Sequence, residues 1–277
     1  MIFAKQLLFI FSFAALSTVA DAQERIVSIG GDVTEIIYAL NAERNLVGRD
    51  STSTIPQAVN TLPDIGYMRQ LNAEGILALA PTKVITTEVA QPSIVLEQLK
   101  SAGVTVETIP FKYNAEHVIE KIKKVGDSLG KPAQAVTLAE NFAAELRAIP
   151  NTPLDVHVLF VLNRAGANQT VAGKDTVADE AIKLVGAKNA MADNVRFVPI
   201  SQEGVIAANP DLIVMTRLGV QSLGSIDKVW ELPGIAHTHA GENKQLVIVE
   251  DIALMSFGLT TPKELFKLRR AAEQVKK

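Results

Sequence analysis

An internal repeat constrains the fold of this chain more than any other feature of its sequence. Residues 71–87 (LNAEGILALAPTKVITT) recur as residues 200–216 (ISQEGVIAANPDLIVMT) without a gap. Each copy begins with a polar residue suited to cap a helix, Asn72 or Ser201. Two helical turns, a proline and a β-branched apolar run typical of a buried parallel strand then follow. A helix that leads into a buried strand is half of a βαβ unit, so the sequence predicts two related α/β lobes.

A second, weaker similarity relates residues 35–42 (EIIYALNA) to residues 180–187 (EAIKLVGA). The number of residues that separates the two copies differs between the two similarities, because the first copy carries additional residues between Val47 and Gln70. Loop insertions on a repeated scaffold commonly carry binding groups. This insertion contains residues 66–69 (GYMR), which are therefore candidates for a ligand site.

The first 22 of the 277 residues are predicted to be a secretory signal peptide. Lys5 precedes an apolar run at residues 7–16, and Ala20 and Ala22 supply the small residues of a cleavage site. The uncharged stretch from Lys5 to Asp21 is shorter than the roughly 18–20 residues of a membrane-spanning helix, so a retained anchor is the less favoured alternative. No later segment is apolar enough for stable membrane insertion, and no cysteine can carry a lipid. We therefore expect a periplasmic protein.

Apolar β-branched runs alternate with helical periodicity along the rest of the chain. Strands are predicted at residues 26–29, 84–87, 104–109, 156–162, 212–216 and 246–249, and amphipathic helices at residues 115–129 and 133–149. The pattern indicates the α/β class, with two Rossmann-like lobes of mostly parallel sheet at residues 23–131 and 151–277. A single long helix at residues 132–150 is expected to join them. Because ligands bind beyond the carboxyl ends of such strands, the expected site is a cleft between the lobes.

The composition excludes several classes of function. The absence of cysteine removes thiolate catalysis, cysteine-ligated zinc and iron–sulfur clusters. A formal charge of −3 and a pI of about 5.9 argue against a nucleic-acid partner. Enzyme motifs are missing too, because Ser222 has Val220 rather than glycine two residues before it and no phosphate-binding loop follows a strand. A metal site of three histidines stays open, drawn from His117, His157, His237 and His239.

Tyr67 has the most suggestive surroundings of the tyrosines. Tyr38 falls on the apolar face of a predicted helix, and Tyr113 lies in a turn. Tyr67 follows Gly66 in the inserted loop and is close to Arg69. A phenolate is a hard oxygen ligand suited to ferric iron, and a nearby guanidinium favours the phenolate form. From chemistry alone, an ordinary loop tyrosine beside a solvated arginine is the other interpretation.

Residues 64–81 (DIGYMRQLNAEGILALAP) resemble the signature of periplasmic haem-binding proteins that supply bacterial haem ABC importers. The resemblance extends over essentially the whole chain after the signal peptide, through residues 25–30, 97–104 and 171–179. It implies that Tyr67 is the axial ligand to the iron of ferric protoporphyrin IX, the transported haem, and that Arg69 holds the Tyr67 phenolate. It also implies a monomeric carrier without enzymatic activity, whose partners are an ABC transporter permease and its ATPase subunits.

The chain departs from this family in two places. Some members carry an iron-ligating histidine where this chain has residues 162–166 (LNRAG). A guanidinium cannot donate a lone pair to iron, so Arg164 either pairs with a haem propionate or is a solvated loop residue. Near the C-terminus the family's Phe-Gly-Pro-Arg is replaced by residues 257–260 (FGLT). Met255 is a further candidate iron ligand, with packing in the core as the favoured alternative.

Glu74 and Glu203 occupy equivalent places in the two copies of the repeat. A carboxylate in the first turn of a helix complements the helix dipole, and this alone accounts for both residues. The resemblance implies a second role, in which one glutamate from each lobe docks onto arginines of the membrane subunits.

Two alternatives to haem transport stay open. A ferric siderophore or cobalamin carrier would share the fold but would not need a phenolate at Tyr67. A secreted α/β enzyme is the remote alternative, because no nucleophile and base can be paired in the sequence.

Overall fold

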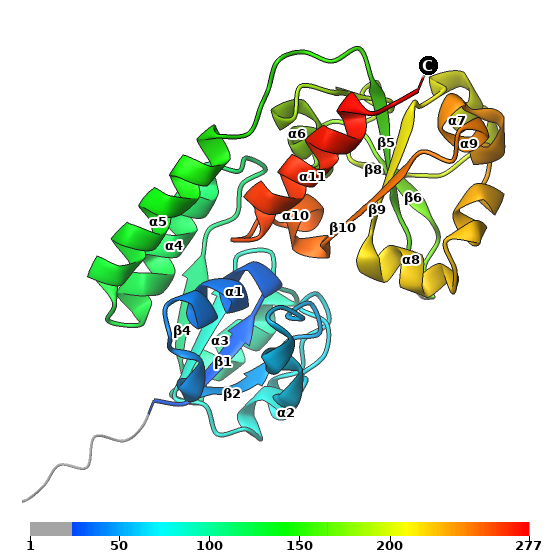
Figure 1. Ribbon diagram of the computed structural model, residues 1–277. Coiled ribbons are helices and arrows are strands. Elements are labelled where there is room, and N and C mark those ends of the chain that lie inside the picture. Colours follow the sequence, from blue (N-terminus) through cyan, green and yellow to red (C-terminus); the bar gives the residue numbers. More distant parts are fainter. Residues whose placement is uncertain (1–23, 165, 277) are drawn as a thin grey trace, which may run out of the picture.

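The computed structural model describes residues 24–164 and 166–276, so the predicted signal peptide lies outside the described residues. Figure 1 shows two α/β lobes and, next to them, the helices α4 and α5 side by side. The sheet of the N-terminal lobe is parallel throughout, in the order β2-β1-β3-β4. Its strands are β1 (Ile26–Ile29), β2 (Leu46–Arg49), β3 (Lys83–Thr87) and β4 (Thr105–Ile109).

Helices cover both faces of the N-terminal sheet. They are α1 (Gly31–Ala39), α2 (Ala73–Leu77) and α3 (Ser93–Ser101), with short 3-10 turns η1 (Glu43–Asn45) and η2 (Gln57–Thr61). Strand residues alternate between two cores: Ile26 and Ile85 pack with α1, whereas Val27 and Val84 pack with α2 and α3. Burial on both faces agrees with the nearly continuous apolar strands of the sequence.

The C-terminal sheet is mixed, with the order β10-β9-β5-β6-β8 and with β7 paired to β5. β6 is antiparallel to β5 and β8, and the other pairs are parallel. The strands are β5 (His157–Leu162), β6 (Thr170–Ala172), β7 (Lys188–Asn189), β8 (Phe197–Pro199), β9 (Leu212–Thr216) and β10 (Leu246–Val249). Sequence analysis predicted β5, β9 and β10, but it missed β2 and the very short β6, β7 and β8, whose few residues carry little periodic pattern.

The internal repeat is confirmed as a structural repeat. The pair α2–β3 in the first lobe corresponds to α7–β9 in the second. Asn72 and Ser201 cap these two helices, and each accepts a hydrogen bond at 3.1 Å, from Gly75 N and Gly204 N respectively. The other elements of the second lobe are α6 (Val177–Leu184), α7 (Gln202–Ala208), α8 (Arg217–Leu223), η3 (Asp227–Glu231), η4 (Ile235–His237), α9 (His239–Glu242), α10 (Asp251–Met255) and α11 (Thr261–Glu273).

A pair of helices links the lobes. α5 (Pro132–Arg147) lies within the range 132–150 where one linking helix was predicted, and a second helix, α4 (His117–Ser128), lies against it (Figure 1). Gly126 permits this close packing, because a Cβ there would lie 2.2 Å from the Ala135 Cβ. α4 contacts α1 and β4 of the first lobe, and α5 contacts α11 of the second. One continuous apolar core therefore runs from Ile85 in β3 through both helices to Val158 in β5.

Two buried carboxylates of α1 attach the first lobe to the loop that follows α10. Glu35 accepts hydrogen bonds from Leu259 N at 2.8 Å and Thr260 Oγ1 at 2.9 Å. Asp32 forms a buried ion pair with Lys121 of α4, and Lys121 Nζ also donates to the Ser256 carbonyl at 2.7 Å. The loop in which the sequence departs from the family pattern is thus an inter-lobe contact. This network and the shared core favour small relative motion of the lobes.

Burial of Glu35 makes folding stability depend on pH. Desolvation raises the pKa of Glu35 from 4.5 to about 7, and the hydrogen bonds from residues 259 and 260 oppose this shift only in part. The native state therefore binds this proton more tightly than the unfolded chain does. The stability that Glu35 contributes is complete below about pH 4.5 and is lost as the pH rises through 7.

We therefore expect Glu35→Gln to flatten the pH dependence of the free energy of unfolding. In the wild-type protein, the contribution of Glu35 to the free energy of unfolding should fall by roughly 3 kcal/mol between pH 4.5 and 7.5, given the size of the pKa shift. The variant should not show this fall. Urea unfolding at several pH values measures it. Glu97→Gln, at an exposed glutamate on α3, is the matched control and should keep the wild-type slope. An unchanged slope in Glu35→Gln would show that Glu35 is ionised at neutral pH.

Candidate ligand-binding site

A cavity of about 740 Å³ lies between the two lobes. Several of its residues lie at the carboxyl ends of parallel strands: Gly31 after β1, Thr87 at the end of β3 and Asp251 after β10. This is the place predicted for the ligand cleft. The first lobe contributes Asp32, Thr52, Tyr67, Arg69 and Phe111, and the second contributes Arg164, Leu218, Asp251, Ile252 and Met255.

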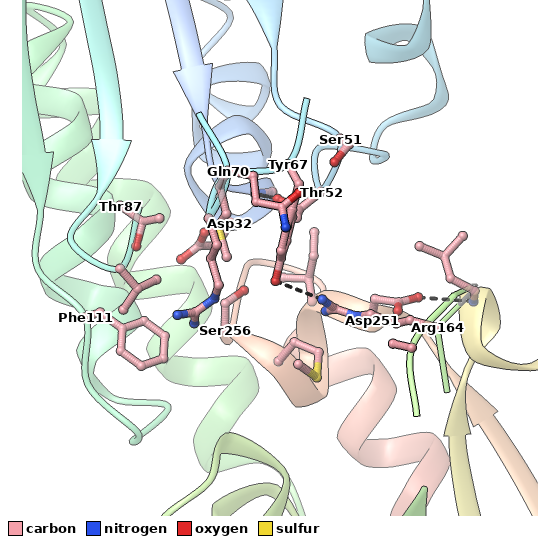
Figure 2. Close-up of a pocket in the computed structure, with 18 of the residues that line it drawn as sticks. Asp32, Ser51, Thr52, Tyr67, Gln70, Thr87, Phe111, Arg164, Asp251 and Ser256 are labelled. Atoms are coloured by element: carbon pink, nitrogen blue, oxygen red, sulfur yellow. Dashed lines mark hydrogen bonds between the residues drawn. The ribbon is translucent and has the colours of Figure 1, made fainter. Parts of the chain in front are cut away.

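The loop that carries Tyr67 is held from both sides by backbone hydrogen bonds. Ser51 N donates to the Gly66 carbonyl at 2.9 Å, and Gln91 N donates to the Met68 carbonyl at 2.7 Å. Gly66 has a φ of 92°, a conformation that glycine adopts without strain. These contacts place the phenol of Tyr67 in the cavity, as Figure 2 shows. The expected position of this residue in the cleft is thus observed.

Asp50 orders the neighbouring loop, and the sequence analysis missed it. Its buried carboxylate accepts hydrogen bonds from Gly30 N at 3.0 Å, Ser53 Oγ at 2.7 Å and Thr52 Oγ1 at 2.6 Å. The segment 50–53 is therefore fixed, and Ser51 within it holds the loop of Tyr67. The only sequence signal was a carboxylate followed by four hydroxyl residues after an unpredicted strand.

Arg164 of the second lobe, not Arg69, contacts the Tyr67 hydroxyl. Arg164 Nη1 donates to Tyr67 Oη at 2.9 Å, and its ζ carbon lies 5.5 Å from the centre of the ring. Figure 2 shows this bond reaching across the site. Arg69 lines the same cavity, but no hydrogen bond joins it to Tyr67 in residues 24–164 and 166–276. The expectation that Arg69 holds the Tyr67 oxygen is therefore not met in this structure.

Asp251 is a second cavity residue that the sequence analysis missed. It follows β10 and accepts a hydrogen bond from Leu218 N at 3.2 Å, at the start of α8. Burial raises the pKa of Asp251, while the positive charge of Arg164 acts in the opposite direction. Arg164 and Asp251 both line the cavity. Position directly beyond a predicted strand was the signal that could have found Asp251.

The rest of the lining is largely apolar and includes Met68, Val89, Phe111, Leu218, Ile252 and Met255. Met255 is half-buried, packs against the large core and also lines the cavity, so both of its expected environments are present. None of the four histidines lines the cavity. Within the described residues, no group of three or more His, Cys, Asp or Glu side chains is arranged to hold a metal ion.

Glu74 and Glu203 are both exposed, in the first turns of α2 and α7. Neither takes part in a salt bridge among the residues that the structure describes. In Figure 1, α2 lies at the bottom of the N-terminal lobe and α7 lies at the upper right, on the C-terminal lobe. The two carboxylates are therefore separated and accessible, and their role in docking stays a prediction. No helix within the described ranges combines the length and apolarity needed to cross a membrane.

Comparison with known proteins identifies relatives over most of the chain. The solved structure of the periplasmic heme-binding protein RhuT from Roseiflexus sp. RS-1, in apo form, is 39% identical and has a TM-score of 0.86. The match covers 90% of this chain and 98% of that one. The vitamin B12-binding protein of Vibrio parahaemolyticus is 27% identical over 240 residues, 82% of this chain and 83% of that protein.

A third relative is an uncharacterized ABC transporter substrate-binding lipoprotein of Bacillus subtilis, YvrC. It is 29% identical over 206 residues, which are 72% of this chain but only 65% of the length of that relative. The family described as periplasmic binding protein matches residues 26–253. Since this match covers well over half of the sequence, the chain belongs to the periplasmic binding protein family.

Proposed function

We propose that this protein binds ferric haem in the cavity between its lobes and delivers it to an ABC-type haem importer. The observation that carries the proposal is the position of Tyr67, whose phenol projects into an inter-lobe cavity in a chain 39% identical to a heme-binding protein. A tyrosine oxygen is an established protein ligand of ferric haem iron. The protein acts as a carrier and not as an enzyme.

The remaining cavity residues suit the other parts of the haem molecule. The apolar side chains, such as Phe111 and Ile252, provide contact for the faces of the macrocycle. Arg69 and Arg164 bring two guanidinium groups into the same cavity, and guanidinium forms charge-assisted hydrogen bonds with carboxylates such as the haem propionates. A cavity of about 740 Å³ falls within the usual range for small-molecule sites.

The partners follow from the family and the repeat. The protein would act in the periplasm as a monomer and present Glu74 and Glu203 to a permease that carries ATPase subunits. Two exposed carboxylates, one on each lobe, could orient the carrier over a two-fold permease and speed their encounter.

Titration of the purified protein with ferric haem tests the proposal. We expect a saturable change in the haem absorption spectrum, and its endpoint counts the haems bound. The same titration with aquocobalamin and with a ferric siderophore should show weaker binding or none. No saturable change with haem would contradict the proposal.

Cobalamin is the second candidate, because a vitamin B12-binding protein is 27% identical over 82% of this chain. A cobalamin carrier would not need the phenolic oxygen of Tyr67. Tight binding of cobalamin that is unchanged by the removal of this oxygen would favour the second candidate over haem.

A further inference from the structure

The Arg164–Tyr67 hydrogen bond crosses the cavity that the ligand would occupy. Arg164 follows β5 in the second lobe, whereas Tyr67 belongs to the first. Both residues line the cavity, and their polar atoms meet inside it at 2.9 Å (Figure 2). In the ligand-free protein Arg164 therefore donates to the phenolic oxygen, the atom proposed to bind the iron.

Removing Arg164 from Tyr67 has an energetic cost. The guanidinium is half-buried and carries five N–H donors and no acceptor, so the donor that leaves the phenol needs another acceptor. An unsatisfied group of this kind destabilises the complex unless a new acceptor replaces the phenol. Asp251 also lines the cavity and accepts a hydrogen bond from Leu218 N, but no hydrogen bond or ion pair joins it to Arg164 in the part of the chain that the structure describes.

We infer that Arg164 is a specificity residue that is transferred from the Tyr67 oxygen to a carboxylate of the ligand when iron takes its place. This inference rests on the proposed function and specifies how that site selects its ligand. An Fe–O bond forms to the phenolic oxygen and the phenolic O–H bond breaks. The water or hydroxide that ferric haem carries in solution leaves the iron, and the phenolic proton goes to that hydroxide or to solvent. A porphyrin without iron leaves Arg164 on Tyr67, so its carboxylates gain nothing from Arg164.

Arg69 is expected to behave differently, although it lines the same cavity. It makes no hydrogen bond to Tyr67, so it can pair with a ligand carboxylate whether or not iron is present. Arg69 should therefore add affinity for carboxylates without linking that affinity to the metal. The link between metal and carboxylate recognition is the property that distinguishes Arg164.

Four ligands measure this link: ferric protoporphyrin IX, its dimethyl ester, metal-free protoporphyrin IX and the dimethyl ester of that compound. Absorbance follows the ferric ligands, and porphyrin fluorescence follows the metal-free ones. In the wild-type protein, esterification should weaken binding of the ferric porphyrin about tenfold more than binding of the metal-free porphyrin, the scale of one charge-assisted hydrogen bond. Arg164→Gln should abolish this difference.

Three further variants complete the test. Arg69→Gln should weaken binding of both carboxylate ligands but keep the tenfold difference, and Arg217→Gln, at an exposed arginine paired with Glu250 outside the cavity, should change nothing. Tyr67→Phe frees Arg164 in advance, so its esterification penalties should be equal with and without iron. Equal penalties in the wild-type protein would overturn the inference while leaving haem binding intact. If the wild-type protein binds no ferric porphyrin, the proposed function itself fails.

Discussion

Tyr67→Phe is expected to weaken ferric haem binding by more than about 100-fold and to remove the spectral features of a phenolate-ligated iron. Loss of a residue that only orients a metal ligand costs about 10- to 100-fold in affinity, so loss of the ligand itself should exceed that range. The substitution deletes one oxygen and keeps the aromatic ring, which limits its effect on packing. Arg164 loses only its acceptor in the cavity.

Absorption spectra and equilibrium titration with ferric haem check this prediction. Tyr38→Phe is the matched control: Tyr38 lies on α1, packs against the core and does not line the cavity. It should bind haem as the wild-type protein does. Identical spectra and affinities for Tyr67→Phe and the wild-type protein would show that the iron is held by another group, and Met255 would be examined next because it lines the same cavity.

The double variant Glu74→Lys, Glu203→Lys should abolish transport while leaving haem affinity unchanged. Both residues are exposed and lie outside the cavity, so the ligand site is untouched. Resemblance to haem carriers implies that these carboxylates meet arginines of the permease. Reversing both charges replaces two attractions with like-charge contacts, each of which costs several kcal/mol at an interface.

Stimulation of the transporter ATPase by the haem-loaded protein and haem-dependent growth are the two measurements. Glu140→Lys, Glu145→Lys provides the control, because it makes the same change in net charge at two exposed positions of α5. The control should support normal growth. Normal transport by the Glu74, Glu203 variant would refute docking through these residues and leave their placement in the first turns of α2 and α7 as a purely helix-stabilising feature.

The repeated units were predictable because their signals are local. Asn72 and Ser201 each cap a helix within three residues, and Pro81 and Pro210 each separate a helix from the strand that follows. The same logic located β1, β3, β5, β9 and β10, since a buried parallel strand is an uninterrupted apolar run, whereas the predicted strand β4 is largely exposed. Tyr67 could be singled out because an inserted loop beside a repeated scaffold is recognisable from the sequence itself.

The partners within the site could not be predicted in this way. Arg69 is close to Tyr67 along the chain, yet Arg164, 97 residues away, contacts the phenol. Sequence distance favoured Arg69, whereas the hydrogen bond in this structure comes from Arg164, because the path of a loop decides where each side chain points. The attachment of Glu35 to residues 259 and 260 was missed for the same reason, whereas the position of Asp251 directly beyond a predicted strand was a usable signal.

The sequence by itself determined the α/β class, the two-lobed organisation, the helical link and the loop that carries Tyr67. These properties depend on periodicity, caps and breaks that act over a few residues. Only the tertiary structure decided that Arg164 reaches Tyr67 across the cavity and that the loop after α10 closes on α1. Such contacts depend on how the two lobes pack around α4 and α5, and that packing is set by the whole apolar core and not by any one segment.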